Sequence, residues 1–305
     1  MDFFGLGPTV TVGATFAEPS DASSTRTVSV KSDASSGGVA TTPTRLYTTG
    51  DTIAGAITLT TPPGSKVDHL GVKVEVLGQI EMGFDRGHAW DFVALAREAR
   101  PAGDLIGVTE IPFVFKDVEM PHESYEGINA RCRYVVRTTV TRTYGGTVTH
   151  DLPFVVRNVS VPPENDAAIK MEVGIEDCLH IEFEYAKAKY HLRDCVVGKI
   201  HFLLVRIKIK HMELEIRRRE STGAGANTYN ESETVAKFEV MDGAPVKGET
   251  APVRLFLSPY DLTPTYKNVA NRFNVKYYLN LVLVDEEDRR YFKQQEIFLY
   301  RDALE

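Results

Sequence analysis

The sequence of 305 residues has only three cysteines, one tryptophan and no long uninterrupted apolar run. Cys132, Cys178 and Cys195 are odd in number and lack the spacing of a disulfide framework, which is typical of free thiols in a reducing compartment. No stretch approaches the roughly 18 apolar residues of a membrane-spanning helix. The opening segment from Met1 to Pro8 is too short to be a signal peptide. We therefore expect a cytoplasmic protein that reaches membranes only through partners.

An excess of positive charge is also absent. The chain has 35 Lys and Arg against 42 Asp and Glu, which gives a net charge of −7. Nucleic-acid binding calls for a basic patch or stripe, so no nucleic-acid partner is expected. A hydrophobic fraction of 43% and a charged fraction of 25% are ordinary for a globular protein, and the length favours two domains.

Alternating apolar and polar residues predict β-strands along most of the chain. Val72–Val76, Ile181–Tyr185 and Val205–Ile209 each have the period of 2 that a half-buried strand requires. Short runs of this kind, separated by Pro and Gly turns, predict an all-β fold of two β-sandwiches.

The clearest single element is a hairpin near the C-terminus. Leu279 to Val284 alternate regularly, Asp285 to Arg290 form a polar reversal, and a second strand is expected from Tyr291 to Tyr300. The acids of Asp285–Asp288 could hold a hard cation, but Arg289 and Arg290 stand beside them. The pattern favours a solvated charged turn.

Three segments depart from the strand pattern. Trp90–Ala99 is compatible with one short helix ended by Pro101, or with a loop packed by its aromatic side chains. Ser20–Thr42 is rich in Ser, Thr, Ala and Gly and predicts a long mobile loop with a possible strand at Thr27–Val30. Ser221–Glu233 has a similar composition and predicts a second flexible segment.

A faint internal repeat supports duplication. Asp51-Thr-Ile-Ala-Gly-Ala-Ile57 resembles Asp194-Cys-Val-Val-Gly-Lys-Ile200, which begins 143 residues later, and Arg133-Tyr134 has a counterpart in Lys276-Tyr277 at the same offset. We expect the domains to be residues 1–160 and 161–305. The linker would lie near Val161–Asn165, where two prolines interrupt any strand.

The candidate chemistry is sparse. Cys178, His180, His191 and Cys195 are residue types that zinc accepts, but the spacing of Cys178 and His180 is tighter than a usual zinc pattern. The alternative is a strand with a buried thiol and two surface histidines. No Gly-x-Ser-x-Gly nucleophile motif is present. We expect a non-enzymatic protein with no cofactor and no metal site.

A binding loop is a stronger candidate. Within Phe238–Glu249, Val240 and Met241 precede Asp242-Gly243, a strong turn signal. Apolar residues at a turn suggest an adaptable contact surface. On the residues alone, however, the pattern favours Val240 as the end of a core strand with Met241 beneath the loop.

Several longer segments resemble a known family. The second half is similar almost throughout to the retromer arrestin-like subunit, the vacuolar protein sorting-associated protein 26 family. The first half is similar at shorter motifs. The segments that carry the resemblance are Ile169–Tyr185, Phe202–Ile209, Met241–Glu249 and Leu279–Ile297, with Phe4–Pro8, Leu77–Glu81 and Pro121–Tyr125 in the first half.

The resemblance implies two arrestin-like β-sandwiches in tandem and a subunit of a trimeric sorting complex on endosomes. It implies that one loop binds the helical-solenoid scaffold subunit, and that a second surface helps a sorting nexin to bind the cytosolic tails of cargo receptors. The implied scaffold-binding residues are Val240, Met241, Asp242, Gly243, Ala244, Pro245, Val246 and Lys247. The implied cargo and sorting-nexin residues are Val173 and Phe292.

Other readings remain open at this point. Arrestin relatives that recruit ubiquitin ligases usually carry Pro-Pro-x-Tyr, whereas Gly64-Ser65 and Glu164-Asn165 follow the two Pro-Pro pairs here. A zinc protein built on the Cys/His set is the remaining alternative. Thr49 stands where animal members of the family carry an acid, which argues against a PDZ-containing sorting nexin as a partner.

Overall fold

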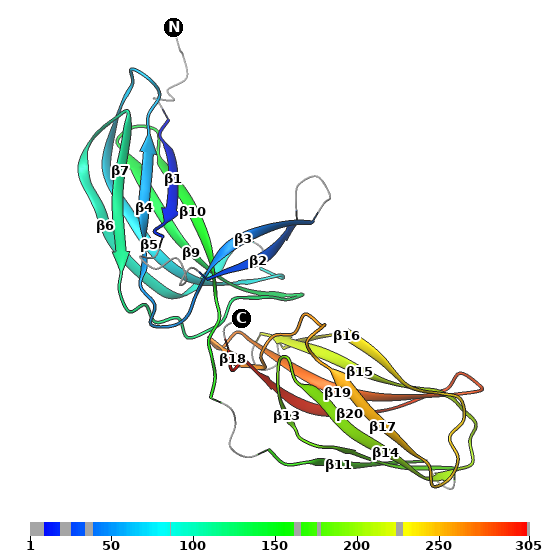
Figure 1. Ribbon diagram of the computed structural model, residues 1–305. Coiled ribbons are helices and arrows are strands. Elements are labelled where there is room, and N and C mark those ends of the chain that lie inside the picture. The colour runs from blue at the N-terminus through cyan, green and yellow to red at the C-terminus, as the bar shows by residue number, and fades with distance from the viewer. Residues whose placement is uncertain are drawn as a thin grey trace. The chain divides into compact units, whose positions relative to one another are not determined.

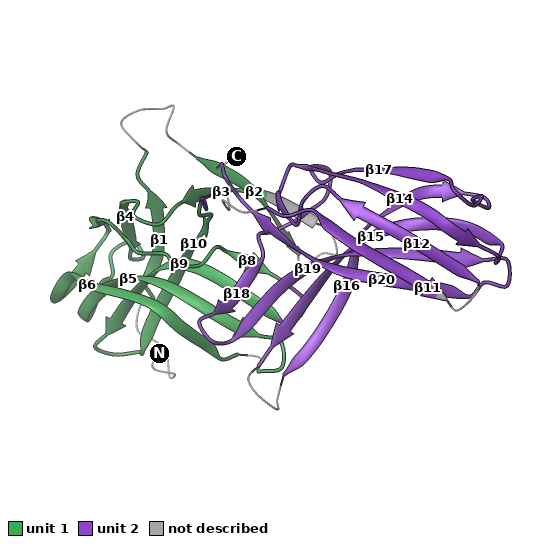
Figure 2. Cartoon of the chain, turned by 90° about the horizontal axis from the view of Figure 1, so that it is seen from below, with its two compact units in different colours: residues 1–126, 130–158 green, residues 127–129, 159–305 purple. Residues whose placement is uncertain are grey.

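The computed structural model describes residues 9–18, 26–33, 39–85, 87–161, 166–175, 178–223 and 228–303. These ranges contain twenty strands and no helix, so the all-β prediction is confirmed (Figure 1). Among them there is accordingly no helix that could cross a membrane. The chain divides into two compact units (Figure 2): unit 1 comprises residues 1–126 and 130–158, and unit 2 comprises residues 127–129 and 159–305.

Unit 1 is a sandwich of two sheets. The smaller sheet has the order β1 (Thr11–Phe16), β4 (Ile53–Thr60), β7 (Val108–Phe115). The larger sheet has the order β2 (Thr27–Asp33), β3 (Val39–Tyr47), β10 (Thr147–Val156), β9 (Ala130–Arg142), β5 (Lys66–Met82), β6 (Ala89–Ile106), and β8 (Tyr125–Glu126) pairs with β9. All pairs are antiparallel except β3 with β10, which is parallel.

Unit 2 has the same architecture. One sheet has the order β11 (Ile169–Ile175), β12 (Leu179–Tyr185), β14 (Cys195–Val205), β17 (Thr250–Phe256). The other has the order β13 (Lys189–His191), β20 (Arg290–Tyr300), β19 (Phe273–Asp285), β15 (Ile209–Thr222), β16 (Tyr229–Asp242), and β18 (Tyr266–Val269) pairs with β19. Here β13 with β20 is the parallel pair.

The strand orders confirm the predicted duplication. The path β12-β14-β17 repeats β1-β4-β7, and the path β13-β20-β19-β15-β16 repeats β3-β10-β9-β5-β6. Even the parallel pairs correspond, since Leu46 faces Val155 in unit 1 and Lys189 faces Phe298 at the same 143-residue offset in unit 2. The strands without a counterpart are β2 and β11.

The repeated sequence motif performs the same local task in both units. The Asp51 carboxylate accepts the Thr48 N–H at 2.8 Å, and the Asp194 carboxylate accepts the His191 N–H at 3.2 Å. In each case the aspartate closes a turn that leads into a strand, as the motif predicts. The glycines that follow, Gly55 and Gly198, are crowded by the neighbouring strand, so that an added Cβ atom would overlap backbone atoms.

Each core lies between the two sheets of its unit. In unit 1 the ring of Phe16 meets those of Tyr47 and Phe154 at centroid distances of 5.6 and 6.0 Å. In unit 2 the core is formed by fully buried aliphatic and aromatic side chains, which include Ile181, Phe183, Val196, Ile200, Leu214, Leu279 and Leu281. Burial of this apolar surface is the main stabilising contribution to both sandwiches.

The short helix considered for Trp90–Ala99 is wrong. These residues belong to β6, which pairs with β5 over its whole length. A register shift between Gly78 and Gln79 of β5 disturbs the strict alternation, and this produces the apolar spacing that resembles a helix. Pro101 fits because β6 is an edge strand and needs no N–H on its open side.

Three further sequence predictions need correction. Val205–Ile209 is not one strand, because residues 206–208 carry the chain from one sheet of unit 2 to the other. Within Ser20–Thr42 the strand predicted at Thr27–Val30 is confirmed and extends to Asp33 as β2, but residues 39–42 belong to β3, which pairs with β2, and are not loop; residues 20–25 and 34–38 lie outside the described residues. Ser221–Glu233 is mostly strand, with Thr222 opposite Tyr229. Most of the predicted linker Val161–Asn165 lies outside the described residues.

Candidate interaction surfaces

The predicted scaffold-binding loop connects β16 to β17 in unit 2. Val240 and Met241 are residues of β16 itself, and both are half-buried. Met241 faces the fully buried Met212 of β15, and the register shift next to this pair makes Val240 the extra residue of a β-bulge. The turn signal at Asp242-Gly243 correctly predicted a loop here, but Val240 and Met241 do not form its tip. They lie at the end of a strand, as the alternative interpretation of the sequence had it.

Hydrogen bonds of the backbone hold the loop that follows β16 in place. Gly243 has φ = 106° and donates its N–H to the Lys210 carbonyl at 2.8 Å. Val246 to Glu249 form a tight turn, closed by the Glu249 N–H to the Val246 carbonyl at 3.1 Å, with Gly248 at φ = 87°. The Glu249 carboxylate caps the Val246 N–H at 2.9 Å. The positive φ angles of Gly243 and Gly248 favour glycine at both positions, and the bonded loop presents a defined surface.

The exposed apolar residue of the loop is Val246, which is 67% exposed, whereas Pro245 is buried beneath it. Asp242, Ala244 and Lys247 are also exposed. The Gly248 N–H bonds the Phe202 carbonyl at 2.7 Å, so the loop is tied to the end of β14. A rigid loop that displays a valine between polar residues is suited to contact a partner protein.

Val173 and Phe292, the predicted cargo residues, lie on different sheets of unit 2. Val173 belongs to the edge strand β11, faces Ile181 of β12 and is half-buried. Phe292 lies in β20 opposite the buried Val282, and its side chain is 67% exposed. An aromatic ring this exposed on a regular strand has no role in the core.

The strand that carries Phe292 also has an open edge. On the side away from β19, β20 pairs with β13 only through Phe298, Leu299 and Tyr300. Among the described residues, nothing extends that ladder along Arg290 to Ile297. Unpaired N–H and C=O groups on such an edge can accept an added strand.

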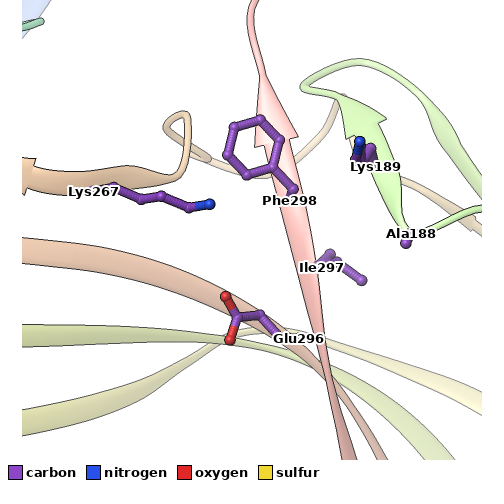
Figure 3. A pocket seen from close by; sticks show the side chains of 6 residues that line it. All are labelled: Ala188, Lys189, Lys267, Glu296, Ile297 and Phe298. Atoms are coloured by element: carbon purple, nitrogen blue, oxygen red, sulfur yellow. The ribbon is translucent and has the colours of Figure 1, made fainter. Parts of the chain in front are cut away.

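A shallow hollow lies where this open edge meets β13 (Figure 3). Its lining residues are Ala188, Lys189, Lys267, Glu296, Ile297 and Phe298. The Lys267 ammonium lies 5.3 Å from the centre of the Phe298 ring, and Glu296 forms an ion pair of 3.0 Å with Lys276. The sequence did not single out these residues, because they come together through the pairing of β13 with β20 and of β18 with β19.

The four-residue zinc set is not assembled. Leu179, next to Cys178, faces Val205 at the far end of β14, whereas Cys195 begins that strand. Ten strand residues separate the two ends, roughly 30 Å at the usual rise. His191 is instead paired with Asp302 at 2.6 Å. This overturns a zinc site built on those cysteines and histidines.

The charged side chains of the hairpin turn Asp285–Arg290 form hydrogen bonds and ion pairs within the chain. The buried Asp285 carboxylate accepts the Glu287 and Arg289 N–H groups, the Arg289 Nε–H at 2.7 Å and the Tyr291 hydroxyl at 3.0 Å. Asp288 pairs with Lys210 at 3.0 Å. The prediction of a charged turn between two strands is confirmed, but the turn is not fully solvated, because Asp285 is buried.

Two β-sandwiches of the same topology in tandem define the class of arrestin-like proteins, and the chain has this fold. A family model described as vacuolar protein sorting-associated protein 26 matches residues 7–288. The chain therefore belongs to this family of sorting proteins, as the resemblance predicted.

Individual relatives agree with the family match. Over 256 residues the chain is 62% identical to vacuolar protein sorting-associated protein 26B of Arabidopsis thaliana, which covers 84% of each chain. It is 57% identical to the Dictyostelium discoideum protein over 239 residues, 78% of this chain and 68% of that one. It is 49% identical to protein 26B-B of Xenopus laevis over 302 residues, 99% of this chain and 87% of the relative.

Proposed function

We propose that the chain is a non-enzymatic adaptor subunit of a retromer-type complex. In this role it binds the helical-solenoid scaffold subunit and helps a sorting nexin to capture the cytosolic tails of cargo receptors for retrieval from endosomes. It acts on the cytoplasmic side of endosomal membranes and reaches them only through its partners. The observation that carries the proposal is the rigid loop around Val246 in a member of this family.

The scaffold is proposed to bind Val240 to Lys247. Val246 supplies the exposed apolar contact, while Met241 supports the loop from the end of strand β16. A partner helix or helix pair would cover Val246 and leave the flanking polar residues at the rim of the interface.

The test uses a charge placed at the loop. Val246→Asp would bury an unpaired carboxylate in the interface and should prevent co-elution with the solenoid subunit in gel filtration. Val161→Asp makes the same change at a valine that is 88% exposed elsewhere in unit 2, and it should leave the complex intact. Equal co-elution of both variants would refute the assignment of the loop.

Cargo tails are proposed to bind at the open edge of β20, with Phe292 contacting a bulky apolar side chain and Val173, on the edge strand β11 of the other sheet, contributing to the same surface. The support is the 67% exposure of Phe292 and the unpaired edge beside it. An extended tail would gain backbone hydrogen bonds from the edge and selectivity from the aromatic ring.

Phe292→Ala should weaken tail capture about tenfold or more in the presence of the sorting nexin, since a large aromatic contact is lost. Scaffold binding should be unchanged, because the loop around Val246 is formed by other strands. The two affinities can be measured by fluorescence polarisation with a labelled tail and by co-elution. Loss of both would indicate a folding defect and remove support for a cargo site.

A further inference from the structure

A second cluster of chemistry-bearing side chains lies on the outer face of the β11-β12-β14-β17 sheet. Glu172 of β11 stands directly opposite Glu182 of β12, and His180 lies two residues from Glu182 on the same face. One ligand atom from each of these three residues lies within 4.8 Å of the other two. The two carboxylates and the imidazole thus converge although their residues come from different strands.

The negative charges of Glu172 and Glu182 lie close together on this face of the sheet. Like charges directly opposite on neighbouring strands destabilise a sheet. The next carboxylate on the same face, Glu184, is neutralised by Lys170 at 3.7 Å and Lys199 at 3.6 Å, but no lysine or arginine of the described residues pairs with Glu172 or Glu182. Glu184 therefore has cationic partners, whereas Glu172 and Glu182 have no lysine or arginine partner among the described residues.

The histidine supplies an independent observation. The His180 side chain is 42% exposed, but its Nε2 atom is shielded from solvent and makes no hydrogen bond among the described residues. It points toward the cluster, 3.7 Å from a Glu172 carboxylate oxygen. A shielded imidazole nitrogen beside two carboxylates is a donor set that a metal ion would satisfy.

We propose that Glu172, His180 and Glu182 bind a divalent transition-metal ion, with zinc as the best-matched ion. Imidazole with carboxylates suits zinc, whereas calcium and magnesium prefer oxygen-only sites. Bond lengths of about 2.0–2.2 Å place zinc ligands about 3.4 Å apart, so the side chains need to close by roughly 1 Å. The exposed Glu172 and Glu182 side chains can do so by rotation about their own bonds.

A further histidine lies on the neighbouring strand. His201 of β14 faces Glu182 on the other side, and its Nδ1 atom is 2.8 Å from the Thr250 hydroxyl. Because that contact engages His201 with Thr250 and His201 is not among the three converging side chains, we expect water to complete the coordination of the ion. Coordination across β11 and β12 would fasten the edge strand that carries Val173.

Calorimetric titration of zinc chloride into the full, chelator-treated chain tests the site. One ion should bind per chain, and Glu182→Gln and His180→Gln should each weaken binding at least tenfold. The matched control is Glu184→Gln, which removes a carboxylate on the same strand and face that is already paired with lysines. It should leave the zinc affinity unchanged.

Thermal unfolding in the presence of chelator should give the same midpoint for all three variants and the unaltered chain, which shows that the fold is intact. Zinc should raise that midpoint for the unaltered chain and for Glu184→Gln only. Absence of zinc binding, or binding that is insensitive to Glu182→Gln and His180→Gln, would overturn the proposal. Loss of binding on Cys178→Ser would also overturn it, since that thiol is not part of the set.

Discussion

Gly198 shows how a single residue of the repeated motif fixes the packing of unit 2. An added Cβ would lie 2.5 Å from the Glu184 carbonyl oxygen and 2.7 Å from the Tyr185 ring. Gly198→Ala should therefore destabilise the protein by about 1–3 kcal/mol, because overpacking forces the strands apart. Chemical denaturation measures the change.

The control for this prediction is Gly13→Ala in β1. There the nearest atom to an added Cβ is a carbonyl oxygen at 3.8 Å, an ordinary contact. The free energy of unfolding should stay within about 0.5 kcal/mol of the unaltered value or rise slightly. Equal losses for both glycines would contradict the packing argument.

Asp285 makes the stability of the C-terminal hairpin depend on pH. Burial alone would raise the pKa of this carboxyl, but hydrogen bonds from Arg289, Tyr291 and the turn backbone outweigh it and lower the pKa to about 2. The unfolded carboxyl has a pKa of about 3.9. Because the folded pKa is the lower one, the contribution is complete above pH of about 4 and is lost as pH falls toward 2.

Asp285→Asn should therefore reduce the free energy of unfolding at pH 6 and flatten its decline between pH of about 4 and 2. Denaturant titrations of the variant and the unaltered chain at pH 6 and pH 3 provide the comparison. Glu286→Gln serves as a control, since Glu286 is exposed and paired only loosely with Lys208 at 3.4 Å. A pH profile unchanged by Asp285→Asn would refute this account.

Among elements, β20 combines structural and proposed binding roles. The Phe298 N–H donates to the Ala188 carbonyl at 3.0 Å, so it points toward β13. Since N–H groups alternate in direction along a strand, those of Gln294 and Glu296 also point to that open side, while that of Gln295 points to β19.

This alternation allows a backbone test of strand addition. Gln294→Pro removes an N–H from the open edge only, and should abolish tail capture while the unfolding midpoint changes little. Gln295→Pro removes an N–H that faces β19 and should lower the midpoint markedly. Tail binding by Gln294→Pro equal to that of the unaltered chain would exclude strand addition at this edge.

The elements also show where sequence patterns succeed. The hairpin of β19 and β20 was predictable because its alternation is regular and a charged turn separates its strands. The β6 strand was not, because Phe92 is the extra residue of a bulge in β6, and the apolar spacing on its two sides then resembles that of a helix. The alternation of Val205–Ile209 is genuine, yet the chain changes sheets within it.

The same limit applies to the candidate sites. Sequence resemblance selected Val240 to Lys247 as a loop, but only the fold distinguishes the half-buried Met241 from the exposed Val246. Local spacing placed His180 with two cysteines, whereas strand pairing places it with Glu172 and Glu182. Residues on neighbouring strands become neighbours through register, which composition and spacing along the chain do not specify.

At the scale of the whole molecule, duplication separates what the fold requires from what is particular to one unit. The aspartate turn, the crowded glycine and the strand order recur in both units and belong to the fold. The added strand β11, the Val246 loop and the exposed Phe292 distinguish unit 2. The proposed partners and the proposed metal ion all use these distinguishing features.

The affinity of the chain for the solenoid scaffold subunit tests the proposed adaptor role most directly. Calorimetric titration of the unaltered chain into the N-terminal part of the same organism's solenoid subunit should show one-to-one binding in the nanomolar range. Met241→Asp should remove it, because a carboxylate at the end of β16 disturbs the base of the Val246 loop. A folded, unaltered chain that shows no heat of binding to the solenoid subunit would contradict the proposal.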